Sequence, residues 1–368
     1  MKKILYVSRD LTHMYFHIKY LMHLRDKGYE VHIACNINKD IDEFISEGIK
    51  VHNIDFARRT ISKDHLLAYK QLKQLQNDEK FDLVHFHTPI AAFIGRAALR
   101  KFDVKTIYTA HGLHFFKGSP IANWIIYYPL EKIAARWTDA IILINKEDFN
   151  LVKKNFSLRG NKIFYINGVG INVSDFNHSD KEIYIYKEKL FISDDEFVVT
   201  CVGELNKNKN QIQLLKAYNM CRNKDKIKVF IVGEGDLEQN LKEYCKNNSL
   251  NNVTFLGYRR DVAQILSVSD ILALVSKREG LPKSLMEGMA AGVALLGNNI
   301  RGTRDVISKN NGYIVEVDDY KTLSAKIDYM YENIDKLKVI KQYNRTDAEK
   351  YDINIINKDL DDILRDMI

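Results

Sequence analysis

Two carboxylates eight positions apart, Glu279 and Glu287, bracket the segment of this chain whose residue types best support chemistry. Pro282 suits the first turn of a helix, where its missing N–H costs nothing. Gly292 fits the stop that follows such a helix. The apolar run at residues 271–275 just upstream is typical of a buried strand. The expected order is therefore strand, loop, carboxylate, helix start, and a second carboxylate on the helix.

This order suits a ligand that carries phosphate in its middle. The unpaired N–H groups at a helix start form an anion site. Carboxylates repel phosphate, but they accept hydrogen bonds from sugar hydroxyls. A diphosphate between two hydroxyl-rich rings fits this arrangement, and a nucleotide sugar is such a ligand. On spacing alone, the alternative stays open that two glutamates only favour the helix dipole.

The length and composition of the chain favour two compact domains. At 368 residues it exceeds what one ordinary core holds, and 46% hydrophobic residues with only four prolines are typical of an ordered protein. The four cysteines are far apart and form no Cys-x-x-Cys pair: Cys35, Cys201, Cys221 and Cys245. They favour a reduced protein over a disulfide scaffold or a zinc site.

The start of the chain shows no secretory signal, because Lys2 and Lys3 precede an apolar run of strand length only. No segment approaches the ~20 apolar residues of a membrane-spanning helix. We therefore expect a cytoplasmic protein whose membrane contact, if it has one, is peripheral.

Positive charge is concentrated in the first half of the chain. Residues 1–170 contain 26 Lys and Arg against 17 Asp and Glu, whereas the rest contains 29 against 31. This imbalance favours an anionic partner for the first half. Nucleic acid is disfavoured, since no Lys/Arg run is interleaved with aromatic residues. An anionic membrane surface or a lipid-linked phosphate fits better, and ordinary solvated surface charge is the alternative.

Short apolar runs alternate with longer amphipathic ones, which predicts repeated βαβ units and parallel sheets covered on both faces. Strands are expected at residues 3–8, 30–35, 50–53, 83–86, 105–110, 140–144 and 162–166, with helices that include 16–27, 63–76 and 90–101. A second alternation gives strands at 197–202, 228–232, 253–256, 271–275 and 293–296, with helices from 210, 237 and 282. The predicted fold class is α/β with two Rossmann-like, doubly wound domains.

Residues 167–172 interrupt the first alternation, and residues 171–196 read as polar and irregular. We place the domain boundary there, with a first domain at 1–170 and a second at 171–350. The chain is expected to be helical from Tyr320 onward, and residues 351–368 to form a helix that packs back on the first domain. Two such domains facing each other form a cleft, and ligands bind beyond the carboxyl ends of the strands.

Polar loops follow two strands of the second half. Gly203 permits a tight turn after the strand at 197–202, and the loop residues Asn206, Lys207 and Lys209 supply donors and charge for a diphosphate. Main-chain groups near Tyr258 could read the edge of a base. The structural alternatives are a solvated polar loop and a capped turn.

Histidines end two strands of the first half. His111 follows the strand at 105–110 and could hydrogen-bond a sugar hydroxyl or a phosphate. His85 and His87 end the preceding strand, ahead of Thr88. We expect these two histidines to point to different faces of the sheet, and no nearby carboxylate completes a ligand set. The sequence therefore predicts no metal site.

Together these motifs make the chain resemble the retaining glycosyltransferases of family 4, which have the GT-B fold. The strongest match is the E-x7-E signature from Glu279 to Glu287, and the motifs around His111 and Lys209 support it. The glycines at residues 168–170 also match. Residues 87–89, 108–112 and 127–132 are similar to the bacterial subgroup that builds exopolysaccharide or capsule repeat units.

The resemblance implies a role for each matching residue. Glu279 would accept hydrogen bonds from the donor sugar, Lys209 would stabilise the leaving diphosphate, and His111 would contact the sugar near its reacting carbon. These three are the expected catalytic residues, and Glu287 would bind the ribose. The remaining expected contacts to the donor come from Gly203, Asn206, Lys207, Tyr258, Gly280, Leu281, Pro282, Ser284 and Leu285.

Two positions depart from the family pattern. Glu204 stands where the family usually has arginine, so we expect it to turn away from phosphate, or Lys207 to replace the missing charge. The first loop, residues 8–17, lacks the paired glycines that the family often places beside the acceptor. The candidates for acceptor contacts are Arg9, His13, His87 and Thr88.

The resemblance implies transfer of a sugar, with retention, from a nucleotide sugar such as a UDP-N-acetylhexosamine to an undecaprenyl-diphosphate-linked saccharide, in surface polysaccharide synthesis. No cofactor is expected. The aromatic and basic stretch at residues 115–137 could rest on the anionic inner face of the membrane. Two alternatives are a non-hydrolysing UDP-sugar epimerase and a nucleotide-sugar-binding module without turnover.

Overall fold

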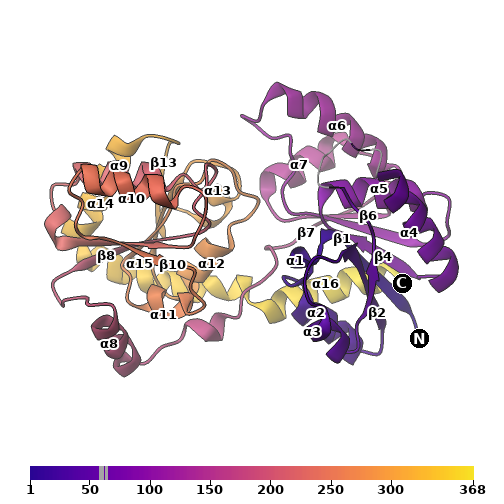
Figure 1. Cartoon of the computed structure of the whole chain (residues 1–368), viewed down its shortest axis with the longest axis horizontal. Coiled ribbons are helices and arrows are strands. Elements are labelled where there is room, and N and C mark those ends of the chain that lie inside the picture. Colours follow the sequence, from indigo (N-terminus) through magenta and orange to yellow (C-terminus); the bar gives the residue numbers. More distant parts are fainter. Residues whose placement is uncertain (58–61, 63–64) are drawn as a thin grey trace. The chain divides into compact units, whose positions relative to one another are not determined.

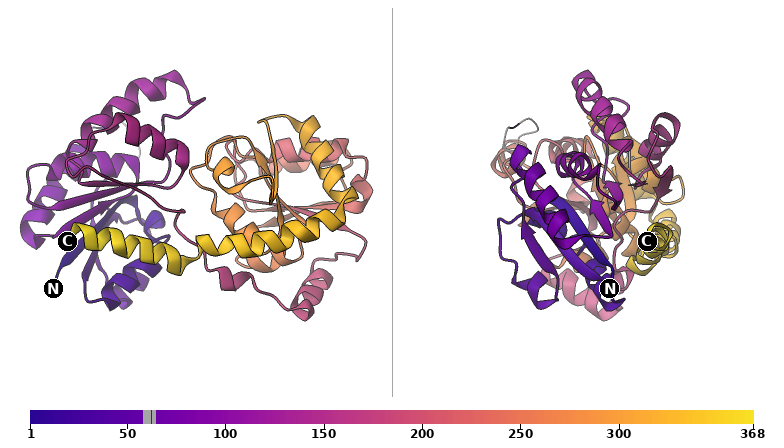
Figure 2. Two further views of the ribbon diagram at one scale, coloured as in Figure 1. Left: turned by 180° about the vertical axis from the view of Figure 1, so that it is seen from behind. Right: turned by 90° about the vertical axis from the view of Figure 1, so that its right-hand side faces the viewer.

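The computed structural model describes residues 1–57, 62 and 65–368, which form two compact units (Figures 1 and 2). Unit 1 comprises Met1–Val169 together with Ile356–Ile368, and unit 2 comprises Gly170–Ile355. Each unit contains one parallel sheet with helices on both faces. This is the doubly wound α/β class that the alternating sequence pattern predicts.

Unit 1 is built on a seven-stranded parallel sheet in the order β3-β2-β1-β4-β5-β6-β7. Its strands are β1 (Lys3–Asp10), β2 (Glu30–Asn36), β3 (Lys50–Asn53), β4 (Leu83–Phe86), β5 (Lys105–Ala110), β6 (Ala140–Leu143) and β7 (Lys162–Tyr165). Strand β6 is apolar and buried at every position, because helices cover both faces of the sheet.

The helices of unit 1 lie in two layers. They are α1 (Leu11–Met14), α2 (Ile18–Asp26), α3 (Asp42–Ser46), α4 (His65–Glu79), α5 (Pro89–Leu99), α6 (Ile121–Ala135), α7 (Lys146–Asn155) and most of α16 (Ile353–Met367). Figure 1 shows α2, α3 and α16 on one side of the sheet and α5, α6 and α7 on the other. Lys63, where the sequence places the start of α4, lies outside the described residues.

The C-terminal helix α16 is tied to α2 through one carboxylate. Asp361 accepts hydrogen bonds from Tyr20 Oη at 3.2 Å and from Lys27 Nζ, and it lies 2.9 Å from His23 Nε2. The buried residues Ile363 and Leu364 lie on the same helix. The last residues of the chain are therefore part of unit 1, although unit 2 precedes them in the sequence.

Unit 2 is built on a six-stranded parallel sheet in the order β10-β9-β8-β11-β12-β13. Its strands are β8 (Phe197–Val202), β9 (Ile227–Val232), β10 (Val253–Gly257), β11 (Ile271–Leu274), β12 (Ala294–Asn298) and β13 (Gly312–Val315). Its helices are η1 (Val173–Phe176), α8 (Asp180–Lys189), α9 (Gln211–Met220), η2 (Lys224–Lys226), α10 (Glu238–Asn247), α11 (Val262–Ser267), α12 (Lys283–Ala290), α13 (Thr303–Val306), α14 (Tyr320–Glu332), α15 (Ile334–Asp347) and η3 (Ala348–Tyr351).

Every strand expected from the sequence is present, with ends shifted by at most two residues. One expectation is wrong, and one strand was not predicted. Residues 171–196 contain η1 and α8, where an irregular segment was expected, and residues 312–315 form the unpredicted edge strand β13. Helix α8 has a Ser179–Glu182 capping box but no buried residue, so its sequence lacks the apolar stripe that reveals most helices.

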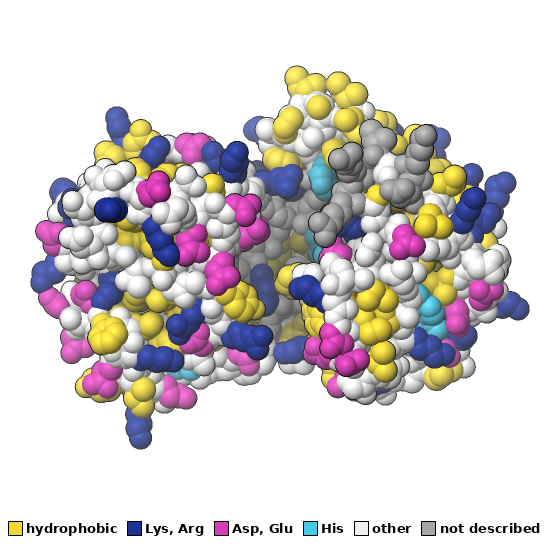
Figure 3. Space-filling model, viewed as in Figure 1, with side chains coloured by type: hydrophobic (Ala, Val, Ile, Leu, Met, Phe, Trp, Pro, Cys, Tyr) yellow, Lys and Arg dark blue, Asp and Glu magenta, His cyan; other side chains and the backbone are white. Residues whose placement is uncertain are grey.

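The outer face of α6 carries exposed apolar side chains. Ile121, Ile125, Ile126 and Ile133 are 42–77% exposed, and Figure 3 shows hydrophobic side chains gathered over this helix. Aromatic residues of the segment 115–137 pack inward instead. Phe115 is fully buried and packs against the rings of Trp124 and Tyr128. The exposed face of this segment is therefore aliphatic rather than aromatic. Among the described residues, no helix is long and apolar enough to span a membrane.

A buried ion pair fixes the inner face of α6. Arg96 on α5 is fully buried, and its Nη2 donates to Glu131 Oε2 on α6 at 2.7 Å. The guanidinium also lies 4.2 Å from the centre of the Tyr108 ring, where its positive charge faces the aromatic π-system. Because both charges are out of water, each depends on the other to offset its desolvation.

We predict that Glu131→Gln lowers the free energy of unfolding of unit 1 by about 3 kcal/mol, because Arg96 keeps a buried charge without its partner. Both tryptophans of the chain, Trp124 and Trp137, lie in unit 1, so their fluorescence during urea denaturation reports on this unit. The matched control is Asp362→Asn, which removes the exposed pair with Arg365 and should change the same quantity by less than about 0.5 kcal/mol. Equal effects of the two variants would contradict the assigned role.

Candidate functional site

The site residues of unit 2 follow the two strands between which the strand order reverses. Strands β8 and β11 are neighbours in the sheet. The helices that follow them, α9 and α12, pack in different core clusters, on opposite faces of the sheet. At such a switch point the two following loops diverge and leave main-chain groups accessible beyond the strand ends. The loops at residues 203–210 and 275–282 therefore meet at the place where doubly wound sheets bind ligands.

An ion pair joins these two loops. Lys209 Nζ lies 2.7 Å from Glu279 Oε1, and the side chains are 25% and 14% exposed. The family resemblance implies that both residues contact one ligand, and the structure brings their side chains together although they are far apart in the sequence. The ammonium group has three N–H donors, so it can keep this bond and still donate to a further acceptor.

The loop after β8 is shaped to hold Lys209 in place. Gly203 has a φ of 152°, and its α-carbon lies against the Lys209 side chain, so that an added Cβ would come within 3.3 Å of the lysine Cδ and Cε. Asn206 Oδ1 accepts hydrogen bonds from the main-chain N–H groups of Asn208 and Lys209 at 3.0 and 2.9 Å. The Asn206 side chain thus stabilises the loop itself.

Glu204, the departure from the family pattern in this loop, is exposed. Glu204 points its carboxylate to Asn206, accepting a hydrogen bond from Nδ2 at 2.9 Å. Lys207 is also exposed. The Lys209–Glu279 contact does not involve Glu204, which agrees with the expectation that this carboxylate turns aside.

The start of α12 presents main-chain N–H groups next to Glu279. Pro282 occupies the cap position, one residue before the helix begins at Lys283. In the described part of the chain, the N–H groups of Gly280 and Leu281 form no hydrogen bond. The N–H of Leu285 donates to the Pro282 carbonyl at 3.1 Å, so it is already used inside the turn. Gly280 and Leu281 are therefore the better anion donors.

A loop that the sequence analysis missed supports this helix start. Arg301 is buried, and its Nε donates to the Glu279 carbonyl at 3.2 Å. Gly302 has a φ of 78°, and a Cβ there would lie 2.2 Å from the Gly280 carbonyl oxygen. Only glycine permits this approach. The sequence signal that could have revealed this loop is a basic residue followed by glycine, three and four positions after the end of strand β12.

Buried side-chain amides connect the end of β12 with α9 and with the residues that follow β11. Asn298 at the end of β12 and Gln213 on α9 exchange two amide hydrogen bonds, of 2.9 and 3.0 Å. Asn298 Nδ2 also donates to the carbonyls of Val275 and Ser276, which follow β11. Asn210, in a left-handed conformation with a φ of 56°, donates to Gln213 Oε1. These polar side chains fix the strand ends relative to one another, and sequence reasoning did not find them.

The remaining predicted donor residues lie around this core. Glu287 sits one turn into α12 and pairs with Lys283 at 3.1 Å. The Ser284 side chain is half-buried on the same turn, whereas the Leu285 side chain is fully buried in the core. Tyr258 is exposed, and its main-chain N–H donates to Glu234 Oε1 at 3.3 Å.

Unit 1 has its own switch point, between β1 and β4. The N–H of Arg9 donates to Thr88 Oγ1 at 2.7 Å, which ties the loops after these strands together. The Arg9 guanidinium pairs with the carboxylate of Asp10, at 2.8 Å from Nη2. The Thr88 hydroxyl thus serves the backbone, and the guanidinium of Arg9 is 43% exposed beside it.

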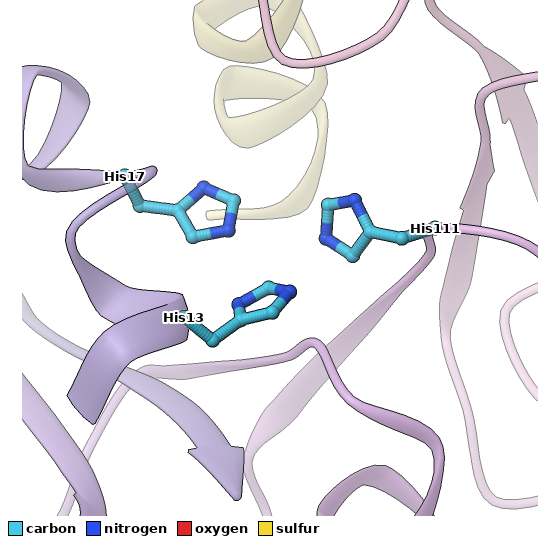
Figure 4. A group of neighbouring side chains, drawn as sticks. All are labelled: His13, His17 and His111. Atoms are coloured by element: carbon cyan, nitrogen blue, oxygen red, sulfur yellow. The ribbon is translucent and has the colours of Figure 1, made fainter. Parts of the chain in front are cut away.

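Five histidines cluster at this switch point. His13 and His17 come from the first loop, His85 and His87 from the end of β4, and His111 from the end of β5. Nδ1 of His87 lies 3.1 Å from Nε2 of His111. Figure 4 shows the rings of His13, His17 and His111 turned toward one another.

The expectation that His85 and His87 point to different faces is wrong, because their ring centres are only 4.3 Å apart. Residues two apart on a strand share a face. The first loop also contributes His13 and His17, which sequence spacing alone could not place beside His111.

These histidines are neutral near pH 7. Burial lowers the pKa of His13 to about 4 and that of His85 to about 3. Burial and the neighbouring histidines hold the pKa values of His17, His87 and His111 well below the ordinary value. Each ring therefore keeps a nitrogen lone pair, and the cluster offers hydrogen-bond acceptors rather than positive charge.

Comparison with known proteins identifies the chain. A family model described as Glycosyl transferase 4-like matches residues 3–145, and one described as Glycosyl transferases group 1 matches residues 183–347. The EpsD protein of Bacillus subtilis (strain 168), whose name assigns it provisionally to the glycosyltransferases, is 32% identical over 358 residues, covering 95% of this chain and 93% of EpsD. The chain belongs to the glycosyltransferases.

Two further similarities agree with this family. An Escherichia coli protein named UDP-Gal:alpha-D-GlcNAc-diphosphoundecaprenol alpha-1,3-galactosyltransferase is 27% identical over 309 residues, covering 80% of this glycosyltransferase and 78% of the relative. The crystal structure of Anabaena Alr3699/HepE in complex with UDP has a TM-score of 0.83 at 19% identity and covers both chains completely. That likeness establishes the GT-B fold, and the first family model falls in unit 1 and the second in unit 2.

Proposed function

We propose that this glycosyltransferase transfers a hexose or N-acetylhexosamine, with retention, from a UDP-sugar to a saccharide on undecaprenyl diphosphate, in surface polysaccharide synthesis. The ion pair between Lys209 and Glu279 at the start of α12 carries the proposal. It places a cation for a diphosphate beside a carboxylate for sugar hydroxyls. The Escherichia coli relative, by its name, uses UDP-Gal and a diphosphoundecaprenol-linked acceptor.

The donor binds along the start of α12 in this proposal. The N–H groups of Gly280 and Leu281 donate to the diphosphate, and the positive end of the α12 dipole adds to the attraction. Glu287 exchanges its bond to Lys283 for the ribose hydroxyls. Glu279 accepts hydrogen bonds from the transferred sugar. The main chain near Tyr258 receives the base.

The chemical step requires stabilisation of a leaving group. The bond between the anomeric carbon and the diphosphate oxygen breaks, and its electron pair stays on that oxygen. Lys209 lies ready to donate to the developing charge, since Gly203 and Glu279 hold its side chain from two sides. The acceptor hydroxyl attacks the anomeric carbon on the same face, and its proton passes to the leaving phosphate. Retention then needs no enzyme nucleophile and no metal.

The acceptor is assigned to unit 1. We assign to His111 the contact with the donor sugar that the family resemblance implies, and the hydrogen bond with His87 orients its ring. Because His87 is itself buried, we give it this positioning role rather than a contact to the acceptor. Arg9 and His13 lie at the same switch point, where the guanidinium can receive the acceptor's phosphate.

We predict that Lys209→Ala retains the fold but lowers kcat by about two orders of magnitude, because one preplaced donor to the leaving diphosphate is lost. The assay follows release of UDP and transfer to a lipid-linked saccharide, over a panel of UDP-sugars, with circular dichroism as the check on folding. Lys246→Ala, an exposed lysine on α10, is the matched control and should behave as the unchanged protein. Near-normal turnover by the Lys209 variant would refute the leaving-group role.

The same incubation separates the proposed function from its alternatives. Transfer with release of UDP supports a glycosyltransferase reaction with that donor. An epimerised UDP-sugar without acceptor-dependent UDP release would support the epimerase, and binding without any product would support a module without turnover. Determining the anomeric configuration of the product by NMR tests retention directly, since an inverted product contradicts it.

We also propose that the enzyme acts at the anionic inner surface of the cytoplasmic membrane through the outer face of α6. Its exposed isoleucines share that face with Lys132 and Arg136, so that apolar and basic side chains meet the same surface. This combination is typical of helices that lie in a membrane interface. Such attachment would bring unit 1 to a lipid-linked acceptor.

The double variant Ile121→Asp/Ile125→Asp is predicted to weaken binding to liposomes with anionic lipid by at least tenfold, measured by flotation, because burying one such side chain contributes roughly 1.5–3 kcal/mol. Val339→Asp is the control, since Val339 is 71% exposed on α15 of unit 2 and Ile125 is 69% exposed. Failure of the unchanged protein to float with anionic liposomes would remove this part of the proposal.

A further inference from the structure

Three histidines of unit 1 place ring nitrogens within reach of one ion. His13 lies on α1, His17 between α1 and α2, and His111 directly after β5. One nitrogen from each ring lies within 4.8 Å of the others. Figure 4 shows the three rings surrounding a common space. Two of these residues belong to the first loop, which sequence reasoning considered only for the acceptor.

In the part of the chain that the structure describes, two of the three histidines keep a buried nitrogen without a hydrogen-bond partner. Among the described residues, Nδ1 of His13 and Nε2 of His17 are buried and form no hydrogen bond. Buried polar atoms are nearly always hydrogen-bonded, so two such atoms side by side point to a missing ligand.

A second group of residues in unit 1 shows that close ligand atoms alone do not indicate a metal site. His32, His52 and Glu79 also bring ligand atoms within 4.8 Å of one another. Their atoms are already engaged, however. His32 Nδ1 lies 2.8 Å from His52 Nε2, and Glu79 Oε2 accepts from Lys3 Nζ at 2.7 Å. An ion there would have to break these bonds, whereas His13 and His17 of the first group each keep a nitrogen that is unpartnered among the described residues.

We propose that His13, His17 and His111 bind one divalent transition-metal ion, with Zn²⁺ as the best match. Neutral imidazole suits Zn²⁺, Cu²⁺ and Ni²⁺, whereas Mg²⁺ and Ca²⁺ prefer oxygen ligands. Three histidines leave a fourth position of tetrahedral Zn²⁺ open to water or another ligand. Nε2 of His111 lies 3.1 Å from Nδ1 of His87, so an ion bound through this nitrogen replaces that contact.

An ion at this place has a consequence that rests on the proposed function. His111 cannot ligate the ion and contact the donor sugar with the same nitrogen. Zn²⁺ is therefore an inhibitor of sugar transfer, and the reaction itself proceeds without it. The site makes transfer sensitive to the concentration of free transition metal, through residues of unit 1 alone.

Metal binding is measured on the full chain after removal of metals with a chelator. Isothermal titration with Zn²⁺ is expected to show one saturable site, and Co²⁺ is expected to give the visible absorption of a tetrahedral nitrogen-ligated ion. The variants His13→Ala and His17→Ala should each weaken Zn²⁺ binding by more than about tenfold. His52→Ala is the matched control, which removes a histidine from the engaged group and should leave the affinity unchanged.

The proposal is overturned if the unchanged protein shows no saturable Zn²⁺ site, if both loop variants keep its affinity, or if His52→Ala abolishes binding. Circular dichroism of each variant confirms that it is folded before it is compared. Inhibition is measured separately from binding. The Zn²⁺ concentration that halves sugar transfer is compared between the unchanged protein and His17→Ala. A binding site without inhibition would leave the metal site intact and refute only its link to sugar transfer.

Discussion

The reversal of strand order in each sheet is the constraint on which the site depends. In unit 2 the chain leaves β8 toward one face and β11 toward the other, so the two loops diverge above neighbouring strands. Lys209 and Glu279 stand on those loops, 70 positions apart in the sequence, and meet at 2.7 Å. A parallel sheet without a switch point would send both loops over the same face and cover the N–H groups at the start of α12.

The two units secure their switch points by different means. In unit 2 the buried amides of Gln213 and Asn298 satisfy each other and hold the strand ends. Unit 1 packs neutral imidazole rings against one another and leaves nitrogens such as Nδ1 of His13 without a partner. Buried polar groups are costly when they are unpaired, so the first arrangement is rigid and the second is suited to accept a ligand.

Much of this architecture follows from the sequence, because continuous apolar runs and strand-end glycines are local signals. The strands, the helix after Pro282, and the candidates Lys209 and Glu279 were all recognisable in this way. The edge strand β13 and the polar helix α8 were missed, since neither has a buried apolar pattern of ordinary length. Their recognition depends on packing against elements distant in the sequence.

The contacts that complete the site could not be predicted for a related reason. Arg301 reaches the Glu279 carbonyl only because β12 lies beside β11, and His17 reaches His111 only because the first loop folds over the ends of β4 and β5. No local pattern encodes such distances. The error over His85 and His87 had a different source, since strand periodicity, applied correctly, places residues two apart on one face.

The central claim is that main-chain N–H groups at the start of α12 hold the diphosphate of a donor between two glutamates. A crystal structure of the full chain with UDP tests it most directly. The account predicts phosphate oxygens within hydrogen-bond distance of the N–H groups of Gly280 and Leu281, Lys209 on the same phosphate, and Glu287 on the ribose hydroxyls. A nucleotide bound away from α12, or a Glu287 carboxylate turned into bulk water in that complex, would contradict it.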